Sequence, residues 1–198
     1  MRVFSRLREW LRAKYIPAFD LDLVPPSDSG FDRFELLLER LASAGVASSN
    51  DLEGCSPAEI EQLKSRFSVT LPATYRWYLT TMGKRSGRLF THDHMAVYYP
   101  HVLRMTAEYR EETADFPNDT SVDLPVDALI IAGRLGDQFQ FIRCNNLEDS
   151  PVWYFNVLDN QIAESNPSII FWLHSFCDQA EQAIKNGYFD AYPNGTSP

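Results

Sequence analysis

CSPAEIEQLKSRFSVTLPATYRWYLTTMG, residues 55–83, encodes two short helices joined by a tight connection. The first helix opens with a capping box: Ser56 supplies the capping hydroxyl, Pro57 occupies the first helical position and the Glu59 carboxylate returns to the cap. Apolar side chains then recur at helical spacing, at Ile60, Leu63 and Phe67. This pattern predicts a helix that buries one face.

The second helix follows Leu71-Pro72, where proline again suits a helix start. Its apolar face is formed by Tyr75, Leu79 and Met82. Gly83 stands where a helix commonly ends. Trp77 and Tyr78 are adjacent, so one of them is expected to leave the core side, either as an interface anchor or as a partly buried residue.

Beyond this hairpin, the hydrophobic period separates helices from strands. A helical period is found in three further segments, 31–44, 101–116 and 168–186. Gly45 and Gly187 provide stops for the first and the last of these helices. Strand patterns are found at 128–134, 138–144 and 151–157. Because the connections between them are short, the strands favour an antiparallel meander.

Two of the strands alternate clearly enough to assign faces. In 138–144, Phe139 and Phe141 share one face, and glutamines occupy the other at Gln138 and Gln140. In 151–157, aromatic residues share one face at Trp153 and Phe155.

The N-terminal segment differs from the rest of the chain. Residues 2–15 predict a basic amphipathic helix, with an apolar stripe at Phe4, Leu7 and Leu11. Such a helix can lie on a membrane surface or pack against its own domain, and the shortness of the stripe favours packing. We expect an N-terminal helix and linker over 1–30, one domain over 31–190 and a flexible tail over 191–198.

Charge and composition narrow the functional classes. The chain of 198 residues has a net charge of −9, and residues 1–15 contribute five basic residues against one acidic residue, so the remainder carries −13. An acidic body argues against direct nucleic-acid binding and is compatible with a basic protein partner, although it also serves solubility. The three cysteines are scattered, and no apolar run is long enough to span a membrane. These features predict a cytoplasmic protein.

The best candidate for catalytic or metal chemistry is the segment Thr91-His92-Asp93-His94. On a strand, His92 and His94 would point to the same side and could share a metal, but a third ligand is needed and only His101 is near in sequence. A polar loop is the simpler interpretation. Reactive cysteines are not predicted, because Cys144 and Cys177 lie in apolar segments, and His174 is interpreted as a surface residue.

An acidic stripe is the main candidate for partner binding. Glu108, Glu112 and Asp115 recur at helical spacing, and Asp93 is a further acidic candidate. The alternative is that the stripe is simply a solvated helix face.

The order of these elements resembles the SUKH superfamily, also called the Smi/Knr-like family. The similarity is carried by the hairpin residues Gly54-Cys55-Ser56, Glu59-Ile60, Leu63, Leu71-Pro72, Tyr75, Tyr78-Leu79 and Met82-Gly83, then by 124–131, 138–143 and 149–154, and finally by 171–176. After Gly83 the family often continues with asparagine and glycines, whereas this chain has Lys84-Arg85-Ser86. The resemblance implies an α+β fold with a central curved, mostly antiparallel sheet of about six strands flanked by helices.

The resemblance also implies a function. Bacterial members resemble immunity proteins that bind and neutralise a cognate polymorphic or contact-dependent toxin, often a nuclease, and eukaryotic members resemble regulators of cell-wall assembly. No catalytic residue or cofactor is implied. We therefore expect a non-enzymatic protein that binds a toxin. The alternatives are a general interaction or regulatory module without a toxin, and a metal-dependent enzyme using His92 and His94. The oligomeric state stays open.

Overall fold

The computed structural model describes residues 30–90, 95–115, 123–145, 147–157 and 161–191. Its helices are α2 (Gly30–Ser43), η2 (Ser49–Asp51), α3 (Pro57–Phe67), α4 (Ala73–Met82), α5 (Tyr99–Asp115), α6 (Ile169–Lys185) and α7 (Tyr188–Ala191). Its strands are β1 (Leu52–Glu53), β2 (Arg85–Ser86), β3 (Ala128–Arg134), β4 (Gln138–Arg143), β5 (Val152–Asn156) and β6 (Gln161–Asn166). The predicted helix over 2–15 lies outside the described residues, as does 192–198 of the predicted tail.

The capping box at the start of α3 is confirmed. The Ser56 hydroxyl accepts the Glu59 N–H at 3.3 Å, and the Glu59 carboxylate accepts the Ser56 N–H at 2.7 Å. The helix ends at Ser68, whose φ of 54° is left-handed, and the Ser68 N–H is donated to the Lys64 carbonyl. These local bonds satisfy backbone groups at both ends of the helix, which explains why its limits were predictable from sequence.

Glycines at both ends of the hairpin allow the chain to pack closely on α4. Gly83 caps α4 with φ of −67°, so a left-handed conformation is not the reason for glycine there. A Cβ at Gly83 would lie 2.6 Å from the Leu79 carbonyl oxygen, and a Cβ at Gly54 would lie 1.8 Å from the Thr80 carbonyl oxygen. The Cys55 N–H donates to the Leu79 carbonyl at 2.8 Å. Close backbone approach is therefore the requirement at both positions.

The strands form two separate antiparallel sheets. Within the described ranges, the main sheet has four strands in the order β3-β4-β5-β6, and β1 pairs with β2 in a second sheet of two strands. The predicted α+β class and antiparallel meander are confirmed, but the expected sheet of about six strands was wrong in its number. The reason is that β1 and β2 span two residues each and pair with one another across the ends of the helical hairpin.

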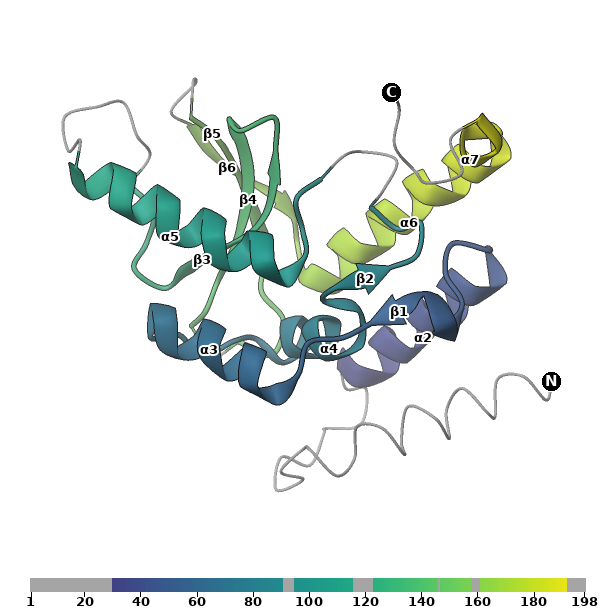
Figure 1. Cartoon of the computed structure of the whole chain (residues 1–198), viewed down its shortest axis with the longest axis horizontal. Helices are drawn as coiled ribbons and strands as arrows, with labels where there is room; N and C mark the ends of the chain where they lie inside the picture. Colours follow the sequence, from purple (N-terminus) through teal and green to yellow (C-terminus); the bar gives the residue numbers. More distant parts are fainter. Residues whose placement is uncertain (1–29, 91–94, 116–122, 146, 158–160, 192–198) are drawn as a thin grey trace.

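Helices cover both faces of the main sheet (Figure 1). On one face, α5 packs over a cluster that includes Phe141 and Phe155, with Phe139 and Trp153 at its edge, as the alternation predicted. The opposite face joins the main core, which includes Leu129, Ile142 and the residues that α2, α4 and α6 bury. Gln140 faces this helix-covered side, and its Oε1 accepts the Trp172 Nε1–H at 2.7 Å. The glutamine face is therefore buried in part, with a polar bond to α6.

The main core is built around aromatic residues from distant segments. Trp172 packs against Phe90 with ring centroids 5.5 Å apart, and Tyr78 lies edge-on to both rings. Tyr78 is fully buried and donates its hydroxyl to the Val97 carbonyl at 3.1 Å. Of the adjacent pair in α4, Trp77 is therefore the one that leaves the core centre. It is half-buried against Phe31 of α2.

Candidate protein-binding surfaces

The acidic stripe on α5 is visible only in part. Glu108 lies on the exposed side of α5, with 64% of its side chain accessible. Glu112 and Asp115 belong to the same helix, but their side chains lie outside the described residues, and so does the whole of Asp93. The structure therefore places one of the four predicted partner-binding side chains on the surface.

Basic side chains accompany the acidic residues of α5. Glu108 lies 3.8 Å from Arg104, one helical turn earlier. Glu111, which the sequence analysis did not single out, lies 3.2 Å from Arg66 of α3. Its spacing of three residues from Glu108 was the signal that could have identified it. Both pairs are largely exposed, so each is weak in water and can exchange for a partner's cation.

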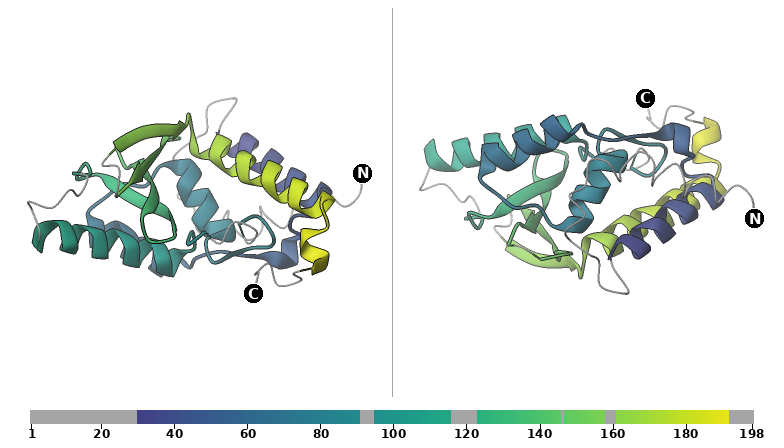
Figure 2. Two further views of the ribbon diagram at one scale, coloured as in Figure 1. Left: turned by 90° about the horizontal axis from the view of Figure 1, so that it is seen from above. Right: turned by 90° about the horizontal axis from the view of Figure 1, so that it is seen from below.

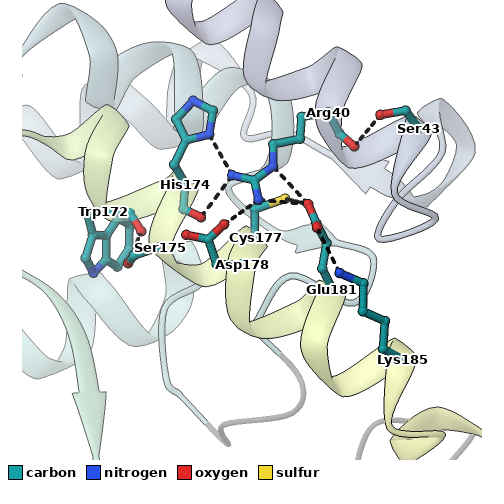
Figure 3. A network of polar contacts seen from close by, with 9 residues as sticks. All are labelled: Arg40, Ser43, Trp172, His174, Ser175, Cys177, Asp178, Glu181 and Lys185. Carbon is teal, nitrogen blue, oxygen red and sulfur yellow. Dashed lines mark hydrogen bonds and ion pairs between the residues drawn. The ribbon is translucent and has the colours of Figure 1, made fainter.

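A denser polar cluster joins α2 to α6 (Figure 3). Arg40 of α2 bonds the Asp178 carboxylate, and its Nε donates to Glu181 Oε1 at 2.9 Å. Its Nη1 lies 3.2 Å from His174 Nδ1 and 3.5 Å from the His174 carbonyl oxygen. Sequence reasoning missed this cluster and interpreted His174 as a surface residue. The side chain is half-buried, because α2 packs against this side of α6.

The pKa values of His174 and Arg40 in this cluster are shifted by burial and by neighbouring charges. Burial lowers the pKa of His174, and the positive charge of Arg40 lowers it further, against the opposing influence of Asp178. Because Arg40 can only donate, its contact with His174 needs the Nδ1 lone pair and favours the neutral tautomer that carries its proton on Nε2. The hydrogen bond to Asp178 raises the pKa of Arg40. The arrangement suits a structural clamp between two helices.

Large apolar side chains are exposed beside this clamp. Leu36 of α2 is 58% exposed, and Phe171 in the first turn of α6 is 55% exposed. The two helices lie side by side and run in the same direction (Figure 2). We define the α2–α6 face as the outer surface carrying Leu36, Arg40, Phe171, His174 and Asp178. Exposed apolar residues mark an interaction surface where they form one contiguous patch.

The strand β6 forms an open edge of the main sheet. Among the described residues it pairs only with β5, and five of its six residues are exposed. The sequence analysis did not predict this strand, because QIAESN has neither strong alternation nor many apolar residues. A polar, short edge of this kind discourages unspecific pairing with other chains.

The cysteines show no sign of nucleophilic chemistry. Cys55, Cys144 and Cys177 are free and buried. Burial raises the pKa of Cys55 and of Cys144 to about 12, and that of Cys177 to about 11. Thiolates are therefore strongly disfavoured at neutral pH, as expected for cysteines that act as small apolar residues.

His92 and His94, the predicted metal ligands, both lie outside the described part of the chain. Among the residues that are described, no three His, Cys, Asp or Glu side chains group closely enough to hold a metal ion. The helices of the described ranges also include none that is long and apolar enough to cross a membrane.

Comparison with known proteins agrees with the arrangement of these elements. The sequence pattern of the SMI1 / KNR4 family (SUKH-1) matches residues 54–183. No curated protein matches the chain. The matched range begins at the glycine that packs on α4, includes the capped hairpin and the main sheet, and ends within α6. Because this range covers most of the sequence, the chain belongs to the SMI1 / KNR4 family (SUKH-1).

Proposed function

We propose that this protein is an immunity protein that binds and neutralises a cognate toxin in the cytoplasm. Family membership over residues 54–183 is the observation on which the proposal rests. It is supported by the charge of −13 outside residues 1–15, which suits a basic partner such as a nuclease domain. The role requires no catalysis by this chain.

The proposed mechanism is occlusion of the toxin's active-site rim by the acidic side of α5. Glu108 and Glu111 are exposed and form solvent-accessible pairs with Arg104 and Arg66. A basic rim on the toxin can replace these arginines at little cost, since exposed pairs are worth under about 1 kcal/mol each. Glu112, Asp115 and Asp93 are proposed to extend the same surface.

The proposal also assigns toxin binding to one part of the chain. We propose that residues 31–190 form the domain that binds the toxin, and that 1–30 and 191–198 are additions to it. Among the described residues, the buried core runs from Phe34 in α2 to Phe189 in α7, and the proposed domain contains all of it.

Co-expression with the product of the adjacent gene tests the proposal. We expect growth to be restored and the two proteins to coelute in size-exclusion chromatography. Glu108→Lys combined with Glu111→Lys should weaken binding about tenfold or more, since two attractive contacts become repulsive. Glu164→Lys, on the exposed strand β6, is the matched control and should bind like the wild type.

Two outcomes would contradict the proposal at different levels. Loss of binding in the Glu164 variant but not in the α5 variant would move the contact surface away from α5. Failure to bind or neutralise any neighbouring toxin, together with capture of a different partner from the native cell, would favour a general interaction or regulatory module of the same family.

A further inference from the structure

The edge of the main sheet at β3 is closed by groups from outside the sheet. The Ile130 N–H donates to Thr106 Oγ1 at 3.1 Å, and the same hydroxyl donates to the Ile130 carbonyl at 3.4 Å. Further along β3, Gly133 and Ala96 exchange two backbone hydrogen bonds, at 2.8 and 3.1 Å. Another strand therefore finds the outward backbone groups of β3 already bonded.

At the opposite edge, the direction of the β6 backbone follows from its pairing. The Val157 N–H, just after β5, donates to a carbonyl in the β3–β4 turn at 2.9 Å. Backbone direction alternates along an antiparallel strand, so Tyr154 turns its groups towards β6, where its partner is Ala163. The N–H and C=O groups of Ile162 and Glu164 consequently point away from the sheet.

These outward groups of Ile162 and Glu164 are uncovered. Among the described residues, no hydrogen bond from outside the sheet reaches β6, and residues 161–165 are all exposed. The helix α6 runs away from the sheet after β6 in both views of Figure 2. A strand edge in this state can pair with another extended strand.

We propose that β6 pairs antiparallel with β6 of a second copy of this chain, about a two-fold axis at Ala163. In this register Ile162 lies opposite Glu164 of the partner subunit, and Glu164 lies opposite Ile162 of the partner subunit. Each of these pairs exchanges two backbone hydrogen bonds. The two main sheets thereby become one continuous sheet.

The residues of β6 select this register. Outward-facing residues must meet outward-facing residues across the contact. If Ile162 faced its own copy, the outward groups of Glu164 would stay unpaired. If Glu164 faced its own copy, two carboxylates would lie directly opposite, which is destabilising. The axis at Ala163 avoids both faults and places a small side chain at the centre.

A second copy fits this edge better than a foreign strand. The side chains of β6 include one charged residue, Glu164, and one large apolar residue, Ile162, which is 42% exposed. A foreign strand would therefore gain little beyond backbone bonds, whereas a second copy matches both positions at once. Two six-residue edges bury less than the standard interface of about 1,600 Å², so we expect a weak dimer.

Closure of the β3 edge limits the assembly to a dimer. The pairing uses β6 of both copies, and a two-fold contact of this kind closes on itself. The helix α5 packs on β3, at the other edge of the sheet, so the dimer leaves α5 of both copies accessible. The proposal therefore does not depend on the identity of the toxin or on the use of α5 in binding it.

Cysteine crosslinking of the full chain tests the register. Two facing Ala163 residues would form a non-hydrogen-bonded pair with Cα atoms about 4.5 Å apart, which a disulfide can bridge. With oxidised glutathione, Ala163→Cys should form a covalent dimer at least about tenfold faster than Gln161→Cys, because copies of residue 161 would be offset by about 13 Å along the strands. Both positions are exposed, and the wild type measures the background from its three buried cysteines.

Sedimentation equilibrium measures the dimer itself and the contact opposite Glu164. The wild type should dimerise with rising concentration between about 5 and about 500 µM, in about 0.5 M salt to screen its net charge of −9. Ile162→Glu places a carboxylate opposite Glu164, and Ile162→Lys is the matched variant that places a cation there. The dissociation constant of the Glu variant should exceed that of the Lys variant about tenfold or more.

Three results would overturn the proposal. The wild type could stay monomeric at the highest concentration. Ala163→Cys and Gln161→Cys could crosslink at the same rate. The two Ile162 variants, with urea midpoints that show both to be folded, could dimerise equally, which would assign the contact to another register or surface. Toxin neutralisation is measured separately, so failure of the pairing leaves the proposed function intact.

Discussion

Replacement of Arg40 by methionine should destabilise the fold by separating α2 from α6. Methionine keeps most of the aliphatic length of arginine but cannot donate to Asp178, Glu181 or His174. The Arg40 side chain is 30% exposed and Glu181 only 24%, so this partly buried carboxylate loses its 2.8 Å ion pair and keeps the longer one to Lys185, at 4.0 Å. Hydrogen bonds to charged groups contribute about 1.5–3 kcal/mol to stability. Because solvent screens the pair with Asp178, we expect the free energy of unfolding to fall by an amount near the lower end of this range, about 1.5–2 kcal/mol.

Urea unfolding followed by far-UV circular dichroism measures this loss. The matched control is Arg104→Met, which removes the same side chain from an exposed pair whose atoms are 3.8 Å apart. That change should cost less than about 0.5 kcal/mol. Equal losses in the two variants would refute the conclusion that Arg40 clamps the helices.

The pH dependence of the stability of Arg40→Met, compared with that of the wild type, tests the role of His174. The pKa of His174 is lowered in the folded state from 6.5, first by burial and then by Arg40, so the unfolded chain binds a proton more readily. The stability of the wild type should therefore fall as the pH drops below about 6.5 towards the lower folded pKa. In Arg40→Met one cause of the shift is absent, so the decrease between pH 7.5 and 6.0 should be smaller. An undiminished decrease would contradict this assignment.

Three further substitutions test individual contacts by urea unfolding. Ser56→Ala removes the cap of α3 and should cost about 1 kcal/mol, whereas an unchanged midpoint would show that the capping box contributes nothing. Gly54→Ala places a Cβ 1.8 Å from the Thr80 carbonyl oxygen, so the backbone must move and the free energy of unfolding should fall by about 3 kcal/mol or more. An unchanged stability of this variant would contradict the close packing. Gln140→Leu leaves the Trp172 N–H without its acceptor and should cost about 1–3 kcal/mol, while a gain in stability would show that the polar bond is dispensable.

Local signals explain why much of the fold was predictable. The start of α3 depends on bonds between residues three apart, and β4 alternates aromatic and polar residues along one strand. The strand β6 was missed because an exposed polar edge has no hydrophobic period, and its structure depends on pairing with β5. The strands β1 and β2 were missed for a different reason, because two residues each are too few to form a periodic pattern.

The candidate surfaces were less predictable than the fold. Helical spacing identified Glu108, but it could not reveal that Arg66, from another helix, lies beside Glu111. The Arg40 cluster was not found at all, because Arg40 and Glu181 are 141 residues apart in the chain. Spacing rules describe one helix at a time, and this cluster exists only where two helices meet.

The amino-acid sequence by itself determined the helical hairpin, the antiparallel meander and the family resemblance, because caps, turns and periodicity act over a few neighbouring residues. Tertiary structure alone decided the division into sheets of four and two strands, the partial burial of Gln140 and His174, and the exposure of Leu36 and Phe171. Those features depend on which surfaces meet when distant segments pack, and packing is settled by the whole chain at once.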